Sequence, residues 1–346
     1  MSIHLQLRAV LEAVTVLSAD SFRFRDEPVR HAAEFPPMPQ GPGYPFHPMS
    51  EHPLVRALQT TLYGRCYSHS LERPPEPVAG NPVPSPELVE RLSAANASRP
   101  RWESGWRVFE VQPTGALSVL KGDSQLTVQP GDYISHAGAY TPVAPGGEVA
   151  IRMHAESRTL QIGFFYVFGE TPGDLWDDHY TVRYYLNAPE SLAPAAVRFV
   201  SERLNQLQVP FRMKALTVPQ WYTRTDSMVL YVARRYHTAV SRMLAKLPAA
   251  LGSHLPPDTP LFTKRLQPGV GLAEDPRTGE SFGMHRCRLV AEGLVDAALA
   301  GKSSLPAKTR AVYRRFSKAG IPVERCFLNA GTVDLYEAAA PHEVHA

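Results

Sequence analysis

The chain has 346 residues, and its 44% hydrophobic and 20% charged content is typical of a globular protein and excludes a disordered chain. Lysine and arginine number 36 against 33 aspartate and glutamate residues. This small surplus, without any basic run, argues against nucleic-acid binding. No segment of about 18 apolar residues or signal peptide is evident, so we expect a cytoplasmic protein without a membrane contact. Cys66, Cys287 and Cys326 lack CxxC spacing, which favours reduced, buried thiols.

Helical patterns and proline-rich stretches alternate in the first hundred residues. Apolar residues at helical spacing predict an amphipathic helix over residues 4 to 17 and a short helix over residues 54 to 67. Residues 26 to 53 and 74 to 86 are rich in proline and predict extended surface loops. Such loops are candidates for contact with a partner, although they more commonly wrap the body of their own protein.

Between residues 102 and 168 the pattern changes to short strands separated by turn dipeptides. The segments are GWRVFEVQP, GALSVLKG, SQLTVQPGDYIS, EVAIRMHA and LQIGFFYVFG. Together they predict an antiparallel β subdomain. Its exposed edges could accept an extended peptide by strand addition. An ordinary closed β module explains the pattern at least as well.

Residues 181 to 233 read as strand, helix, strand, short turn and strand, and we expect this stretch to form the functional centre. The strands TVRYYLN and FRMKALTV alternate in two-residue steps, so Arg212 and Lys214 lie on the face opposite Phe211 and Met213. The polar faces are predicted to gather Arg183, Tyr185, Lys214, Tyr222 and Arg224, with Tyr231 as a further candidate. Arginines, a lysine and phenols with few carboxylates suit an anionic phosphate group.

A glycine-rich stretch follows a helix that we expect to end near Leu247. It carries Lys264, His285 and Arg286, and its backbone could approach a ligand closely. Its GxG piece lacks the preceding strand and the GK[ST] ending of a phosphate-cradling loop, so we predict no ATP site. Helices at about 286 to 299 and 306 to 318 and a terminal strand, FLNAGTVDLY, complete the prediction. The thirteen histidines are dispersed, so neither a metal site nor a cofactor is predicted.

Four ordered motifs suggest a family: RYYLN, FRMK, YTRTDSMVLYV and PLFTKRLQPGVGLAEDPRTGESFGMHRC. They resemble the HopA-type effector family over most of residues 160 to 335. That family was named for plant-pathogen type III effectors and includes the lyase subunits of class V lanthipeptide and thioamitide biosynthesis. FRMK and YTR also resemble, more distantly, the phosphothreonine lyases and the lyase domains of class III lanthipeptide synthetases. Those enzymes β-eliminate phosphate from phosphoserine or phosphothreonine and leave dehydroalanine or dehydrobutyrine.

The resemblance implies roles for the residues that match the lyase motifs. Lys214 falls on the position of the base, and Arg183 and Arg224 fall on cationic positions that grip phosphate. Because an ordinary lysine is protonated at neutral pH, nearby guanidinium groups and burial would have to lower the pKa of Lys214. Lys264 and Arg286 are further candidates for phosphate binding. Alternatively, Arg224 forms a structural ion pair with Asp226.

The proton donor stays open at this point. The phosphothreonine lyases place a histidine as general acid on the strand before the lysine, where this chain has Tyr184 and Tyr185. Tyr185, Tyr222 and His285 are the candidates that remain, and packing is the more ordinary role for His285.

The combined expectation is an α+β fold in which an N-terminal helix and an antiparallel β subdomain pack on a C-terminal mixed α/β domain that is lyase-like. The predicted divisions are N-terminal helices and proline-rich loops over 1–100, the β subdomain over 101–170, and a phosphothreonine-lyase-like domain over 171–346. The expected function is β-elimination of phosphate from a ribosomally synthesised precursor peptide with leader and core. The resemblance implies a heteromeric complex with an aminoglycoside-phosphotransferase-like kinase that phosphorylates the peptide first.

Two alternatives belong to other classes. One is a non-catalytic subunit that binds a phosphopeptide or the kinase, and the other is a secreted effector that acts on host proteins. The ordered pattern of residues 5 to 17 argues against the effector, because secretion signals of that kind tend to be serine-rich and disordered.

Overall fold

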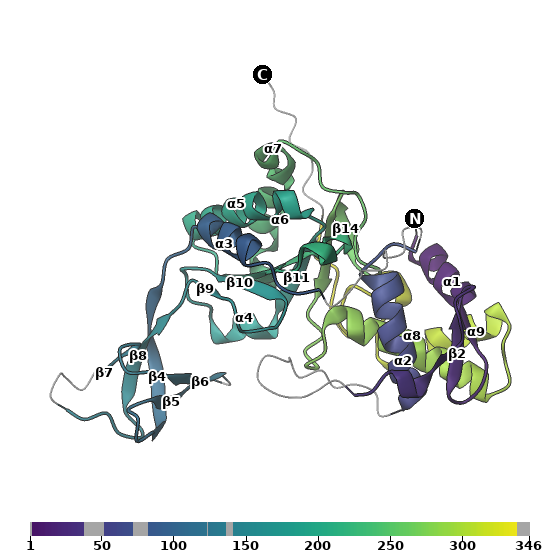
Figure 1. Ribbon diagram of the computed structural model, residues 1–346, viewed down its shortest axis with the longest axis horizontal. Coiled ribbons are helices and arrows are strands. Elements are labelled where there is room, and N and C mark those ends of the chain that lie inside the picture. Colours follow the sequence, from purple (N-terminus) through teal and green to yellow (C-terminus); the bar gives the residue numbers. More distant parts are fainter. Residues whose placement is uncertain (1, 38–51, 72–81, 123, 136–140, 338–346) are drawn as a thin grey trace.

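A seven-stranded antiparallel sheet organises the larger part of the molecule, in a computed structural model that describes residues 2–37, 52–71, 82–122, 124–135 and 141–337 (Figure 1). Its strand order is β14-β15-β11-β13-β12-β10-β9. The strands are β9 (Glu156–Ser157), β10 (Phe164–Phe168), β11 (Thr181–Leu186), β12 (Phe211–Leu216), β13 (Met228–Ala233), β14 (Lys264–Gln267) and β15 (Val270–Glu274). We call it the central sheet.

Helices cover one side of the central sheet, where the apolar positions of the alternating strands are buried. Figure 1 shows α5 (Ala193–Gln206) and α6 (His237–Ala245) on this side, with α3 (Pro86–Ala95) beside α5 and α7 (Leu247–Leu251) above them. The strand residues Val182, Tyr184, Met213 and Leu230 are fully buried and share one hydrophobic core with Val197 and Val200 of α5. The polar positions on the other face of the central sheet do not take part in this packing.

The N-terminal elements belong to the same hydrophobic core. They are α1 (Ile3–Ala13), the strands β1 (Val14–Val16), β2 (Ser21–Phe24) and β3 (Arg30–His31), and α2 (Pro53–Leu62). They pack with α8 (Phe282–Leu299) and α9 (Leu305–Lys318). A Cβ on Gly293 would lie 2.5 Å from the Cα of Val312, so this glycine permits the close approach of α8 and α9.

A second, smaller sheet projects away from this body and has its own core (Figure 1). Its strand order is β6-β5-β4-β8-β7. The strands are β4 (Arg101–Val111), β5 (Leu117–Lys121), β6 (Ser124–Val128), β7 (Tyr133–Ser135) and β8 (Glu148–Met153). Trp106, Val119 and Ile151 are among the residues buried between them. The predicted α+β fold, including an antiparallel β subdomain, is therefore confirmed.

Several predicted elements differ from the structure. The strand LQIGFFYVFG was predicted for the β subdomain, but β10 pairs with β12 in the central sheet. The glycine-rich stretch contains β14 and β15, which the periodicity did not indicate, and α3 was missed. The helix predicted over residues 4 to 17 ends at Ala13, because the chain turns into β1. The terminal strand was wrong: within the described part of residues 327 to 336, no strand forms, and Tyr336 is buried instead.

Some predictions stay predictions. The proline-rich loops fall mostly on residues 38–51 and 72–81, which lie outside the described residues. The division of the chain at residues 100 and 170 also remains a proposal.

Among the helices that the structure describes, we find none with the length and apolar character needed to cross a membrane.

Candidate functional site

The register of four neighbouring strands brings two rows of side chains onto the polar face of the central sheet. In the first row, Lys214 lies opposite Tyr166 and Val229, and Val229 lies opposite Tyr185. Two residues further along each strand, the second row consists of Phe168, Arg212, Tyr231 and Arg183. Residues that lie opposite one another in antiparallel strands point to the same side of the sheet. The predicted polar face therefore exists, and the register fixes its members.

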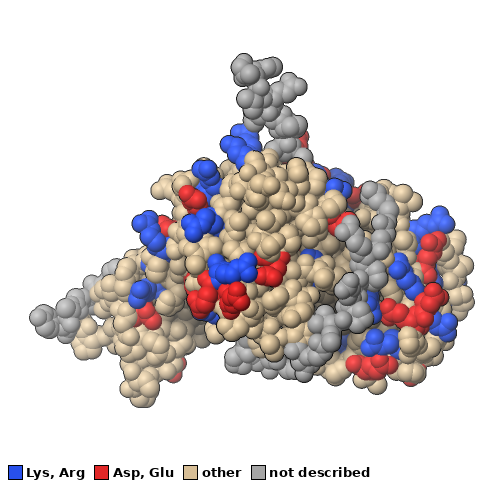
Figure 2. All heavy atoms as spheres, turned by 45° about the horizontal axis from the view of Figure 1, so that its top comes forward, with Lys and Arg blue, Asp and Glu red and all other residues tan. Residues whose placement is uncertain are grey.

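Apart from Phe168, the residues of these rows line a cavity of about 710 Å³, which we call the central cavity. Its other walls come from segments that are distant in the sequence. Phe35 and Pro36 follow the N-terminal strands, Tyr63 and Tyr67 lie on a π-helical turn that continues α2, and Ser281 caps the start of α8. In the view of Figure 2, basic and acidic side chains are mixed over the surface.

Lys214 lies within this cavity with its amine in a sheltered position. Its Nζ donates to Oε1 of Gln161 at 3.0 Å and lies 4.0 Å from the centre of the Phe164 ring. Within the described residues, no carboxylate lies at ion-pair distance from this amine. An amine in such a position loses hydration without gaining a counter-ion, and this favours its neutral form.

The pKa of Lys214 is lowered as a result. Burial is the largest cause, and the positive charges of Arg183 and Arg224 act in the same direction, whereas Tyr231 and Asp226 oppose them. Burial and nearby guanidinium groups were both predicted to lower this pKa, and burial has the larger effect.

The two arginines that were predicted to bind phosphate are both held by carboxylates. Nη2 of Arg183 lies 2.6 Å from Oδ2 of Asp275. Arg224 donates from Nε and Nη2 to the two oxygens of Asp226, at 2.8 and 2.9 Å, and from Nη2 to the hydroxyl of Tyr63 at 2.9 Å. The ion pair considered for Arg224 is therefore present. Each arginine keeps a fixed orientation at the cavity, but its charge is largely balanced.

Arg212 differs from both, and it was not predicted as a site residue. Its side chain is exposed to the cavity, and among the described residues no carboxylate pairs with it. Its guanidinium lies 4.7 Å from the centre of the Tyr231 ring, and that of Arg183 lies 5.4 Å from the same ring. The available signal was its two-residue spacing from Lys214 on one strand. Arg212 gives the cavity positive charge that the described carboxylates do not balance.

The acidic residues that line the central cavity are already paired. The pairs are Glu34 with Arg30, Asp226 with Arg224, and Glu280 with Arg288. An anion that entered the cavity would therefore meet the cations rather than free carboxylates. This arrangement fits a phosphate group better than a cationic ligand.

Tyr231 and Tyr185 line the central cavity, and its cations affect the pKa values of both phenols. Burial alone would raise the pKa of Tyr231, but the charges of Lys214, Arg183 and Arg212 outweigh it and lower that pKa. Burial instead raises the pKa of Tyr185 well above its ordinary value. The hydroxyl of Tyr185 is buried, and an interaction with Tyr67 partly offsets the effect of burial on its pKa.

Tyr222 and Lys264, which were predicted as site residues, do not line the central cavity. The hydroxyl of Tyr222 donates to the carbonyl of Leu216 at 2.7 Å, at the end of β12. Nζ of Lys264 pairs with Asp334 at 2.8 Å. Both polar groups are thus engaged in local structure.

Arg286 and His285 also lie elsewhere, inside the body of the protein. Arg286 is fully buried and donates to the carbonyls of Cys326 and Leu328, each at 2.7 Å. Its Nη1 lies 2.6 Å from Nδ1 of His285. Burial, together with the charge of Arg286, lowers the pKa of His285 to about 3. His285 is therefore neutral, accepts from Arg286, and cannot serve as the acid considered above.

Within the described residues, no three His, Cys, Asp or Glu side chains gather in a way that could hold a metal ion.

Comparison with known proteins identifies the region that contains this site. The sequence model of the HopA1 effector protein family matches residues 155–328. No curated protein matches the chain. One similar solved structure is the effector protein from Pseudomonas syringae pv. tomato strain DC3000, with 14% identity, a TM-score of 0.42, and coverage of 82% of this chain and 92% of that chain. Another is the effector protein from Pseudomonas syringae pv. syringae strain 61, with 16% identity, a TM-score of 0.43, and coverage of 78% and 88%.

Proposed function

Because the chain belongs to the HopA1 effector protein family, we propose that it is a lyase that β-eliminates phosphate from phosphoserine or phosphothreonine. The proposed substrate is a ribosomally synthesised precursor peptide, and the product carries dehydroalanine or dehydrobutyrine. One observation carries the proposal: the amine of Lys214 has a lowered pKa and lies in a cavity whose unbalanced charge is positive.

The elimination requires a base beside the Cα of the phosphorylated residue. In the proposed step, the neutral amine of Lys214 takes the Cα proton, and the electron pair of that bond forms the Cα=Cβ double bond. The Cβ–O bond breaks, and phosphate leaves with its electron pair. General-base action of this kind contributes roughly 10²–10⁴-fold to the rate. The lowered pKa of Lys214 increases the fraction of neutral amine that is available to act in this way.

Tyr231 is the proposed proton donor. Its hydroxyl gives a proton to the bridging oxygen of the leaving phosphate, so that the product leaves as hydrogen phosphate. The lysine ammonium then returns the Cα proton to the tyrosinate, and the enzyme is restored. The lowered pKa of Tyr231 favours it over Tyr185, whose pKa is raised. Tyr185 remains a proposed hydrogen-bond donor to the substrate.

The proposed phosphate site combines one cation without a carboxylate partner among the described residues and two that carboxylates hold. Arg212 supplies the unpaired guanidinium, while Asp275 and Asp226 hold Arg183 and Arg224 in place. Fixed guanidinium groups stabilise the negative charge of the leaving phosphate without reorganisation during the reaction. The proposed roles of Arg183 and Arg224 are thus electrostatic.

A kinase partner is also proposed. Elimination consumes a phosphorylated side chain, and the sequence predicts no ATP site. By resemblance to the family, an aminoglycoside-phosphotransferase-like kinase would supply the phosphate in a heteromeric, cytoplasmic complex.

The test of the proposed function uses a synthetic phosphoserine peptide and the purified full chain. We expect the peptide to lose the mass of phosphoric acid in mass spectrometry and to gain a thiol-reactive dehydroalanine. The unphosphorylated peptide is the control and should stay unchanged. Binding of the phosphopeptide without mass loss, with the kinase also present, would instead support the non-catalytic binding subunit.

The family description favours a second candidate, an effector that acts on host proteins. The chemistry would be the same, but the phosphorylated residue would belong to a folded protein. Side-by-side incubation with a phosphorylated precursor peptide and with phosphorylated host-cell proteins distinguishes the two. Faster elimination from the peptide favours the biosynthetic role.

The pH dependence of the rate should reflect the two shifted groups. The base must be neutral and the phenol protonated, so we expect a bell-shaped profile of kcat against pH. The midpoints of the two limbs should lie at pH values below the ordinary pKa values of about 10.4 for lysine and about 10 for tyrosine. Because Arg183 lowers the pKa of both Lys214 and Tyr231, Arg183→Gln should move the whole bell to higher pH.

The matched control is Arg203→Gln, which removes an exposed guanidinium on α5 that bonds to Gln206. Its profile should coincide with that of the unchanged protein. A bell that stays in place in Arg183→Gln would contradict the assignment of its limbs to Lys214 and Tyr231.

A further inference from the structure

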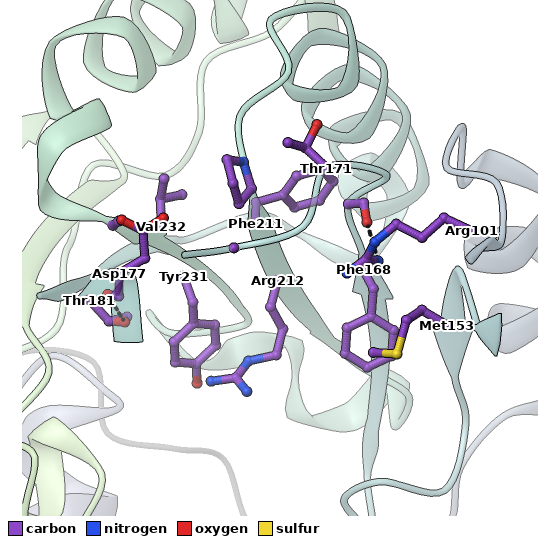
Figure 3. A pocket seen from close by; sticks show the side chains of 14 residues that line it. Arg101, Met153, Phe168, Thr171, Asp177, Thr181, Phe211, Arg212, Tyr231 and Val232 are labelled. Carbon is purple, nitrogen blue, oxygen red and sulfur yellow. Dashed lines mark hydrogen bonds between the residues drawn. The ribbon is translucent and has the colours of Figure 1, made fainter. Parts of the chain in front are cut away.

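A second cavity, of about 170 Å³, adjoins the central cavity at one end of the central sheet (Figure 3). It lies where β10 and β13 end and where β11 and β12 begin. Arg212 and Tyr231 line both cavities. Figure 3 shows these two side chains extending from neighbouring strands in the same direction. A ligand that runs along the strands from Lys214 would pass them and reach the second cavity.

The walls of this second cavity are largely apolar. Phe168, Phe211 and Met153 line it, and Phe211 is only 8% exposed. Gly169 allows the Phe211 ring to lie close, since a Cβ at this position would be 2.7 Å from Cδ1 of that ring. We call this cavity the flanking pocket and define it by Met153, Phe168, Gly169 and Phe211, bounded by Arg212 and Tyr231.

The charged groups of the flanking pocket, apart from Arg212, are engaged. Arg101 donates to the carbonyl of Gly169 at 2.9 Å and to Glu103 at 2.7 Å. Asp177 pairs with Arg235 at 2.8 Å. The pocket thus offers an incoming group an apolar wall rather than a free charge. Arg101 and Met153 belong to β4 and β8, so the β subdomain contributes to the pocket.

We propose that the flanking pocket binds an apolar side chain of the phosphorylated peptide while the phosphorylated residue lies at Lys214. This inference rests on the proposed function and adds a sequence preference to it. Strand residues advance about 3.3 Å each, so Pro210, at the start of the pocket, is about 13 Å along the chain from Lys214. An extended peptide that follows the strands covers this distance in three or four residues. The preferred position is therefore three or four residues from the phosphorylated one.

The experiment moves one leucine along a phosphoserine peptide that otherwise contains glycine and alanine. We expect kcat/KM to rise about tenfold when leucine occupies one position, three or four residues from the phosphoserine, because an apolar pocket discriminates side chains by about 10- to 200-fold. The rise should occur on one side of the phosphoserine only. Elimination that proceeds equally well for every leucine position would overturn the pocket and leave the proposed lyase standing.

A pocket-filling variant tests the location. Thr171 lines the flanking pocket from the segment between β10 and α4 (Leu175–His179). Thr171→Phe should remove the leucine preference, lowering kcat/KM for the preferred peptide by about tenfold. The matched control is Thr114→Phe, at an exposed turn of the β subdomain, which should retain the preference. A preference that survives in Thr171→Phe would place the apolar contact elsewhere and overturn the proposal.

Measurements of peptide affinity distinguish a failure of the flanking-pocket proposal from a failure of the proposed elimination reaction. The dissociation constants of the same peptides, measured by fluorescence anisotropy, should show the same leucine position and the same effect of Thr171→Phe. If no peptide is eliminated but the affinity preference is present, the lyase proposal fails and the pocket stands. If neither elimination nor a leucine preference in affinity is found, both fail.

Discussion

Replacement of Lys214 by alanine is expected to leave phosphopeptide unconverted, with a rate lowered by roughly 10²–10⁴-fold. The variant removes the only group in our proposed step that takes the Cα proton. Binding should persist, because Arg212, Arg183 and Arg224 remain in the cavity. Mass spectrometry of a single-turnover reaction measures the conversion, and fluorescence anisotropy with the same peptide measures the binding.

Two further variants make the result specific. Lys214→Arg keeps a positive charge but cannot be deprotonated in a protein, so it should be as inactive as the alanine variant. Lys246→Ala removes an exposed lysine that follows α6 and should have no effect. Rapid conversion by Lys214→Arg would show that the position needs charge rather than a base, and would remove Lys214 from the proposed role.

The polar face was predictable because strand alternation is local. In TVRYYLN and FRMKALTV the two-residue period alone places Arg183, Tyr185 and Lys214 opposite the buried positions. The register between strands was not predictable in this way. That Arg212 lies opposite Tyr231, and Tyr231 opposite Arg183, depends on pairing between strands that a helix and a turn separate. This pairing brings the polar residues of separate strands together in one site.

Long-range partners explain the residues whose placement was missed. Arg286 is one of several basic residues in its segment, and nothing local shows that the carbonyls of Cys326 and Leu328 bury it. Asp275 lies far from Arg183 in the sequence, and yet it neutralises that arginine. Tyr63 and Tyr67 lie on the π-helical turn that continues α2, and both line a cavity whose other walls are distant in the sequence. A single sequence shows charge and periodicity, but not which charges are already paired.

Substitution of Arg212 by alanine should lower kcat/KM for the phosphopeptide by about 10- to 100-fold. A hydrogen bond to a charged group contributes about 1.5–3 kcal/mol, and Arg212 is the lining guanidinium that no described carboxylate engages. The loss should appear in KM, and the limb of the pH profile that reflects Tyr231 should also move to higher pH, because Arg212 lowers the pKa of Tyr231. Initial rates at several peptide concentrations measure it, and Arg212→Lys should recover part of the loss by restoring the charge.

Comparison with Arg183 distinguishes ligand binding from structural support. Arg212 is exposed, so Arg212→Ala should leave the free energy of unfolding within about 0.5 kcal/mol of the original value. Arg183→Ala would leave Asp275 without its partner, and a half-buried carboxylate that loses its ion pair destabilises the fold. We therefore expect urea unfolding to show a loss of stability for Arg183→Ala alone. If Arg212→Ala binds and converts the phosphopeptide normally, the free guanidinium has no part in holding phosphate, and the balanced arginines must do so.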